Sequence, residues 1–74
     1  MRYHFHILED GLFIEDEEGQ EFSNDSDVRN EAVEACISIA RDAFMKGSAR
    51  RVEVDVRSRD VMVLKVVISL AIEE

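Results

Sequence analysis

Polar and apolar residues alternate at the start of the chain with a period of two. The apolar members are Tyr3, Phe5 and Ile7, and the polar members between them are Arg2, His4 and His6. This period is typical of a strand, because successive side chains of a strand point to opposite faces. Residues 9–11 end in Asp-Gly, a pair that accepts the positive φ angles of tight hairpin turns. The pattern predicts a strand with one aromatic face, a tight turn and a return strand over residues 12–15.

A second, acidic turn is predicted at residues 16–19, where Gly19 supplies the conformationally permissive position. Residues 20–22 then either extend the return strand or form a short further strand. The acids around this turn are Asp16, Glu17, Glu18 and Glu21. Their spacing does not match a calcium-binding EF-hand loop, and so small a domain has little room for a catalytic cleft. We therefore expect an exposed acidic turn.

One long helix of about 22 residues is predicted next, with a length of about 33 Å. Asn24 is its expected N-cap, and Asp27 suits a short-armed form of the capping box. Gly47 is expected to end the helix in the left-handed conformation. Apolar and small residues recur at helical spacing and form one face: Val28, Ala32, Ala35, Cys36, Ile39, Ala40 and Ala43.

The apolar stripe of this helix is wider than a half-buried helix needs. Val33, Ile37 and Phe44 broaden it on one flank. These residues either cover the edge of the sheet and the chain termini or form a contact surface for a second copy of the chain. The sequence leaves both interpretations open.

Two further strands are predicted after the helix. Val52, Val54 and Val56 alternate with charged residues, and residues 58–60 form a turn without glycine. The last strand spans residues 61–72 and is apolar on both sides for much of its length. Such a strand indicates either a central place in the sheet or a covered second face.

The order strand-strand-helix-strand-strand predicts a single α+β domain over residues 1–74. We expect a four-stranded, mainly antiparallel sheet with the long helix packed on one face. One helix cannot cover both faces of such a sheet. The second face is expected to carry His4, His6, Leu8, Val61, Val63 and Val67. An apolar patch of this kind on a small domain indicates dimerisation or partner binding.

The net charge of −8 is unevenly distributed along the chain. Residues 1–34 contain eleven acids against Arg2 and Arg29, whereas residues 35–74 contain six acids and seven bases. This balance argues against nucleic-acid binding, because phosphates repel a negative surface. The basic residues Arg50, Arg51, Arg57 and Arg59 lack an aromatic stacking platform. The acidic half could instead dock a basic protein partner.

No motif in the chain predicts catalysis or a cofactor. His4 and His6 lie at i and i+2 and offer two metal ligands, but a stable site needs three or four. Cys36 falls on the apolar face of the helix, where a buried thiol behaves as a small hydrophobic residue with a raised pKa. The chain lacks a glycine-rich phosphate loop, Cys-x-x-Cys and Gly-x-Ser-x-Gly. We expect no enzyme activity.

The sequence also indicates a compartment. The lone Cys36 is consistent with a reducing environment, and no signal peptide or membrane-spanning segment is recognisable. We therefore expect a cytoplasmic protein without a membrane partner.

Several segments together resemble a known family. They are residues 2–6 (Arg-Tyr-His-Phe-His), the Asp-Gly turn, residues 14–19 (Ile-Glu-Asp-Glu-Glu-Gly) and residues 27–32 (Asp-Val-Arg-Asn-Glu-Ala). The chain is similar to short uncharacterised alphaproteobacterial proteins that begin with Arg-Tyr-Phe-Phe-His and carry an acidic Asp-x-Glu-Gly turn. It departs from them after residue 54, where a glycine of the last turn and a proline near Val67 are missing. The resemblance implies no established activity and assigns no catalytic residue.

Three functional hypotheses follow from these patterns. The first is a self-associating interaction module, a homodimer that uses the uncovered sheet face with His4, His6, Val61, Val63 and Val67, or the helix flank with Ile37 and Phe44. The second is an antitoxin-like or regulatory protein that binds a basic partner through its acidic half. The third is a weak metal-binding module that uses His4 and His6.

Overall fold

The computed structural model describes residues 1–74, which form one antiparallel sheet and one helix. The elements are β1 (Arg2–Glu9), β2 (Leu12–Ile14), β3 (Gln20–Glu21), α1 (Asp25–Lys46), β4 (Arg51–Ser58) and β5 (Val61–Ser69). The strand order is β2-β1-β4-β5, and β3 pairs with the first residues of β1. The predicted α+β class and element order are confirmed. The short β3 makes a fifth strand, so the second of the two alternatives for residues 20–22 is correct.

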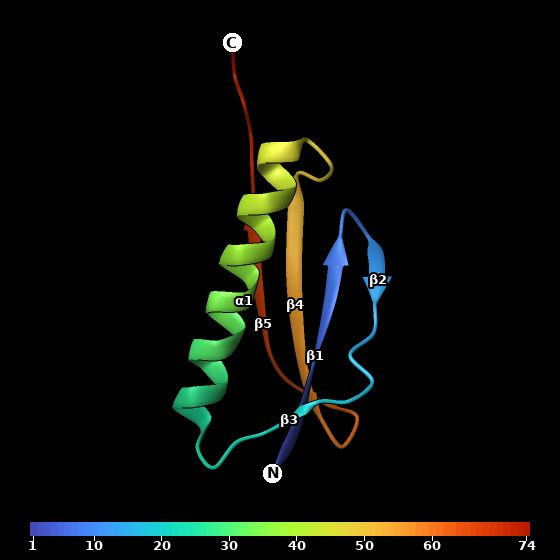
Figure 1. Ribbon diagram of the computed structural model, residues 1–74, viewed down its shortest axis with the longest axis vertical. Coiled ribbons are helices and arrows are strands. Elements are labelled where there is room, and N and C mark those ends of the chain that lie inside the picture. Colours follow the sequence, from blue (N-terminus) through green and yellow to red (C-terminus); the bar gives the residue numbers. More distant parts are fainter.

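The central strands are β1 and β4, and β5 lies at an edge (Figure 1). Of the two alternatives for the last strand, a central place in the sheet is therefore wrong. That strand also ends at Ser69, because residues 70–74 leave the sheet and extend away from it. The apolar character of β5 on both sides is not explained by flanking strands within this chain.

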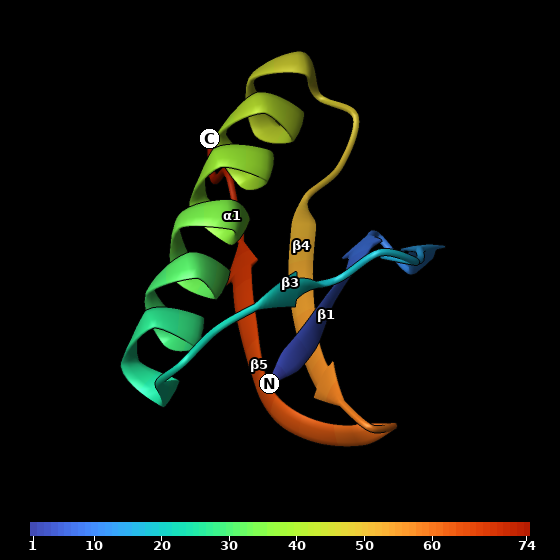
Figure 2. The same cartoon turned by 60° about the horizontal axis from the view of Figure 1, so that its bottom comes forward.

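α1 packs on β4 and β5 and does not reach β2 (Figure 2). On the same face of the sheet, Tyr3 and Phe5 of β1 are nevertheless buried in the core. The small side chains of Ala32, Cys36 and Ala40 let the helix approach the sheet closely, above the fully buried Val52 and Val54. Eleven residues form the buried core: Tyr3, Phe5, Val28, Ala32, Cys36, Ala40, Ala43, Ala49, Val52, Val54 and Val56. The core is small, as a chain of 74 residues requires.

Both ends of α1 are capped as predicted. Asn24 is extended, and its side-chain oxygen accepts the N–H of Asp27 at 2.9 Å. At the other end Gly47 adopts φ 73°, and its N–H bonds to the carbonyl groups of Ala43 and Phe44. Lys46 pairs with Asp42 at 3.0 Å. The Asn24 and Gly47 contacts satisfy backbone groups that the helix itself leaves unpaired.

Both hairpin turns contain residues with positive φ angles, but the backbone strain differs between the two turns. Asp10 and Gly11 have φ angles of 48° and 87°, as the Asp-Gly pair predicts. In the second hairpin Arg59 and Asp60 adopt 54° and 64° although neither is a glycine. A non-glycine residue with a positive φ angle stores about 1–2 kcal/mol of backbone strain. The second turn is therefore a weak point of the fold.

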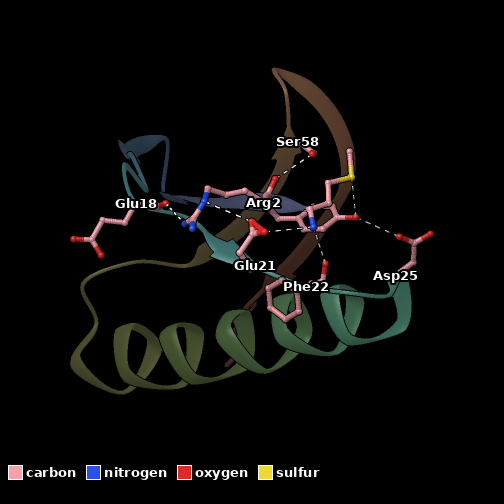
Figure 3. A network of polar contacts seen from close by, with 8 residues as sticks. Arg2, Glu18, Glu21, Phe22, Asp25 and Ser58 are labelled. Carbon is pink, nitrogen blue, oxygen red and sulfur yellow. Dashed lines mark hydrogen bonds and ion pairs between the residues drawn. The ribbon is translucent and has the colours of Figure 1, made fainter.

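A network at the first residues of β1 ties four elements together (Figure 3). Arg2 donates to the carbonyl oxygen of Glu18 at 2.7 Å and lies 3.7 Å from the carboxylate of Glu21. Tyr3 donates its hydroxyl to Asp25 at 3.4 Å, and Ser58 donates to the carbonyl oxygen of Arg2 at 3.1 Å. These contacts hold β3, the start of α1 and the end of β4 against β1.

Candidate functional site

The face of the sheet that α1 does not cover is the first candidate surface, and we call it the open face. Cross-strand pairing arranges its side chains in three rows: Phe13, Leu8, Glu53 and Val67; His6, Asp55 and Lys65; and His4, Arg57 and Met62. The apolar patch expected from the sequence is thus crossed by a charged stripe along β4. The open face is more polar than expected because the strand in its middle carries an acid or a base at every second position.

A pair of carboxyl groups lies at the centre of the open face. Glu53 is 8% exposed, and its two oxygens lie 3.1 Å from Arg51 and 3.4 Å from Lys65. A hydrogen bond with Asp55, together with these two cations, holds the pKa of Glu53 below its usual value. Burial, together with the neighbouring Glu53, raises the pKa of Asp55. These opposite pKa shifts mean that Glu53 loses its proton more readily than Asp55 does.

One oxygen of Asp55, Oδ1, is buried and has no hydrogen-bond partner. An unpaired buried acceptor costs about 1–3 kcal/mol. The carboxyl pair is therefore a source of local instability on the open face.

The two histidines are held in place by the loop after β2. The N–H of Asp16 donates to Nδ1 of His6 at 3.0 Å, so that Nδ1 carries no proton. Nδ1 of His4 lies 2.9 Å from the carbonyl oxygen of Asp16, which can only accept, so this Nδ1 is protonated. The rings are nearly parallel, with centroids 6.1 Å apart. No group of three or more His, Cys, Asp or Glu side chains is placed to hold a metal ion.

The Asp16 carboxylate fills a gap in the sheet between β2 and β3. Its oxygens accept the N–H of Phe5 at 3.0 Å and of Gly19 at 3.1 Å. Although partial burial opposes the shift, these backbone donors lower the pKa of Asp16. Gly19 has φ 73°, and a Cβ there would lie 2.8 Å from the carbonyl oxygen of Tyr3. The acidic turn is thus partly structural, whereas the sequence suggested only an exposed loop.

A bulge changes the positions of the expected β5 contacts. Val56 pairs with Leu64, but Arg57 pairs with Met62, so Val63 is an extra residue in the ladder. Met62 consequently lies opposite Arg57 on the open face. Val61 pairs with Ser58, one residue further along β4, and so does not join the face of His4. Val63 is exposed at the bulge, and Val67 is exposed on the open face opposite Glu53.

The second candidate surface is the free edge of β5 together with the adjoining flank of α1. Phe44 is half-buried and packs against the core, while Ile37 is 52% exposed. The opposite flank of the helix, which includes Ala35, faces a hollow of about 350 Å³ shared with Ile7. Ile37 therefore projects on the β5 side, beyond the sheet.

Sequence reasoning missed the groups whose role depends on cross-strand neighbours. Glu53 and Asp55 looked like the solvent side of an alternating strand, and their pairing with Lys65 follows from the strand order. Asp10 looked like a turn residue, yet its carboxylate also accepts the N–H groups of Arg50 and Arg51, both at 2.9 Å. The one sequence signal for this site was the i, i+2 spacing of Glu53 and Asp55, which places both carboxyl groups on the same face of a strand.

Most of the chain matches one known protein family. A family described as a domain of unknown function, DUF6894, matches residues 2–69. The chain belongs to this family. The resemblance to an uncharacterised family is thereby confirmed, and the family itself carries no assigned activity. No curated protein and no solved structure shows a significant match to the chain. The structure contains no helix that is long and apolar enough to cross a membrane.

Proposed function

We propose that this member of the family is a non-enzymatic interaction module whose partner is a second copy of itself. The main support is an excess of exposed surface. The chain exposes 5260 Å², whereas a folded monomer of 8.5 kDa exposes roughly 4,700 Å². The excess of roughly 600 Å² approaches the ~800 Å² that each partner of a standard interface buries. Residues 70–74 account for part of it.

The exposed apolar side chains lie on both sheet edges and on the helix flank. Phe13 is 54% and Val67 39% exposed, and Ile37 adds a further exposed aliphatic side chain. The hollows of the surface are open to solvent, and the largest, of about 640 Å³, lies between Glu9 and the last turns of α1. A surface of exposed apolar strips and open hollows is suited to binding another protein.

Sedimentation equilibrium tests this proposal. Over about 1 to about 200 μM, a range that includes a micromolar Kd, we expect the apparent mass to rise from 8.5 kDa towards twice that value. A constant mass of one chain over the whole range would refute self-association.

A second candidate function is the docking of a basic protein segment, and the hollow beside α1 favours it. This hollow has Ile7, Ile14 and Ala35 among its apolar lining and Glu15 and Glu31 among its acids. An apolar floor with an acidic rim suits an amphipathic basic segment. A synthetic peptide of alternating leucine and lysine should shift the NMR signals of Ile14 and Ala35 and lose affinity in high salt. Binding that is insensitive to salt, or absent, would count against this function.

A further inference from the structure

We infer that two copies of this chain join through the free edge of β5, so that their sheets continue into one another and their helices pack side by side. This inference rests on the proposed self-association and identifies the surface that carries it.

The backbone of β5 presents unpaired hydrogen-bonding groups along its outer edge. Leu70 donates its N–H to the carbonyl oxygen of Arg50, on the β4 side. Because these groups alternate in direction along an antiparallel strand, Lys65, Val67 and Ser69 direct their N–H and C=O groups away from β4. No strand, tail or loop of the chain pairs with them. A long edge of this kind is a template for another strand.

The edge also lacks most of the features that protect free strands from pairing. Residues 61–70 contain neither proline nor an acid, and Lys65 is their one charge. That charge is already paired with Glu53 at 3.4 Å. The bulge at Val63 protects one end of the strand and leaves the rest regular.

Charge favours a second copy as the occupant of this edge. The chain carries a net charge of −8, and eleven of its acids lie in residues 1–34, which include β1, β2 and β3. Two such chains repel one another through most of their surfaces. The β5 edge and the flank formed by Val33, Ile37 and Phe44 contain no acid, so two copies can approach there at the smallest electrostatic cost.

The spacing of the helices fits this arrangement. The Sγ atom of Cys36 lies 3.6 Å from the carbonyl oxygen of Val52 and 3.8 Å from that of Val66, which places the helix between β4 and β5. Neighbouring strands are about 4.8 Å apart. A twofold axis midway between two β5 strands therefore separates the helix axes by about 10 Å, within the usual 8–10 Å for packed helices.

Ile37 follows Cys36 and thus lies beside the middle of β5, where the two helices would meet. It is half exposed in the single chain. Side chains of this size fill the space between helices at that separation. The sheet edge and the helix flank would then form one continuous interface.

Of the antiparallel registers that keep like faces together and do not oppose two lysines, two overlap over more than half of β5. One places Val67 opposite Val67 of the partner subunit, and the other places it opposite the partner's Lys65. In both registers a lysine at position 67 meets a lysine of the other chain. In the monomer that lysine lies next to Glu53, which pairs with Val67 across the strands, so the fold should tolerate it.

Sedimentation equilibrium of matched variants tests the inference. We expect Val67→Lys and Ile37→Lys each to weaken the dimer about tenfold or more, because each brings a like charge or a desolvated charge into the interface. The control Phe13→Lys removes a comparably exposed apolar residue on the opposite sheet edge and should leave the dimer constant unchanged. Circular dichroism and urea unfolding confirm that each variant is folded.

The outcomes separate the two proposals. A wild-type chain that stays monomeric refutes self-association and this inference together. A wild-type dimer that Phe13→Lys disrupts, while Val67→Lys and Ile37→Lys do not, refutes the β5 edge and retains self-association through the open face or the other edge.

Discussion

The carboxyl pair on the open face should make Asp55→Asn a stabilising substitution at neutral pH. Asn has the shape of a protonated Asp and supplies an N–H donor to Glu53 without a second negative charge. In the native protein, Asp55 either keeps a proton against its ordinary pKa of 3.8 or loses the hydrogen bond to Glu53. Two unit charges about 5 Å apart repel by about 3 kcal/mol at an effective dielectric constant of 20.

Lys65 and Arg57 offset much of this repulsion, since both attract the Asp55 carboxylate. We therefore expect a net gain of about 1 kcal/mol in the free energy of unfolding, a fraction of the uncompensated repulsion. For a chain of this size such a gain raises Tm by about 4–8 °C.

The gain should depend on pH in a defined direction. Folding raises the pKa of Asp55, so the wild-type penalty is absent below the ordinary value of 3.8 and is complete above the raised value. Glu53 behaves in the opposite way, because its lowered pKa contributes stability that is lost as the pH falls below 4.5. Because Asp55 also affects the pKa of Glu53, the difference between variant and wild type measures the contribution of the two carboxyl groups together.

Urea unfolding at one fixed protein concentration, from pH 3 to pH 8, measures this difference. Glu17→Gln is the control, because it removes one negative charge from an exposed position. A destabilised Asp55→Asn variant at pH 7, or a gain that is the same at pH 3 and pH 7, would refute the reasoning about the carboxyl pair.

Three further substitutions or probes test other parts of the structure. Asp60→Gly should raise the free energy of unfolding by about 0.5–1 kcal/mol, because glycine relieves the positive φ of the second hairpin turn at some entropic cost; a loss of stability in urea would show that the Asp60 side chain matters more than its backbone. Gly19→Ala should cost about 2 kcal/mol or more, since the new Cβ would crowd the carbonyl oxygen of Tyr3 at a positive φ; wild-type stability would contradict the close approach. Cys36 should react with a thiol reagent only as fast as the chain unfolds, because burial raises the pKa of the thiol and hides it from the reagent. Immediate stoichiometric reaction of the folded protein would contradict the place of Cys36 in the core.

Local patterns were sufficient to predict the elements and both ends of the helix. Alternation around Phe5 and Val54 predicted the strands, and the Asn24 and Gly47 signals predicted both helix caps, because each depends on residues close in sequence. The strand order was not accessible in this way. The apolar β5 suggested either a central strand or a covered second face, yet such a strand can equally lie at an edge of the sheet.

The parts of the candidate site that could not be predicted depend on contacts between distant residues. Asp16 replaces a strand partner for Phe5, which requires the loop to fold back along β1. The burial of Glu53 requires Lys65 beside it on β5. The bulge at Val63 shifts Met62 to the open face, and no residue type near it indicates the shift.

Amide hydrogen exchange, followed by NMR at increasing protein concentration, tests the central claim most directly. The outward N–H groups of Lys65, Val67 and Ser69 should exchange rapidly in dilute solution and become protected as dimers form, whereas Val66 and Ile68, which face β4, should be protected throughout. Outward groups that remain unprotected at concentrations where the chain is dimeric would show that the β5 edge stays free and that the account of this surface is wrong.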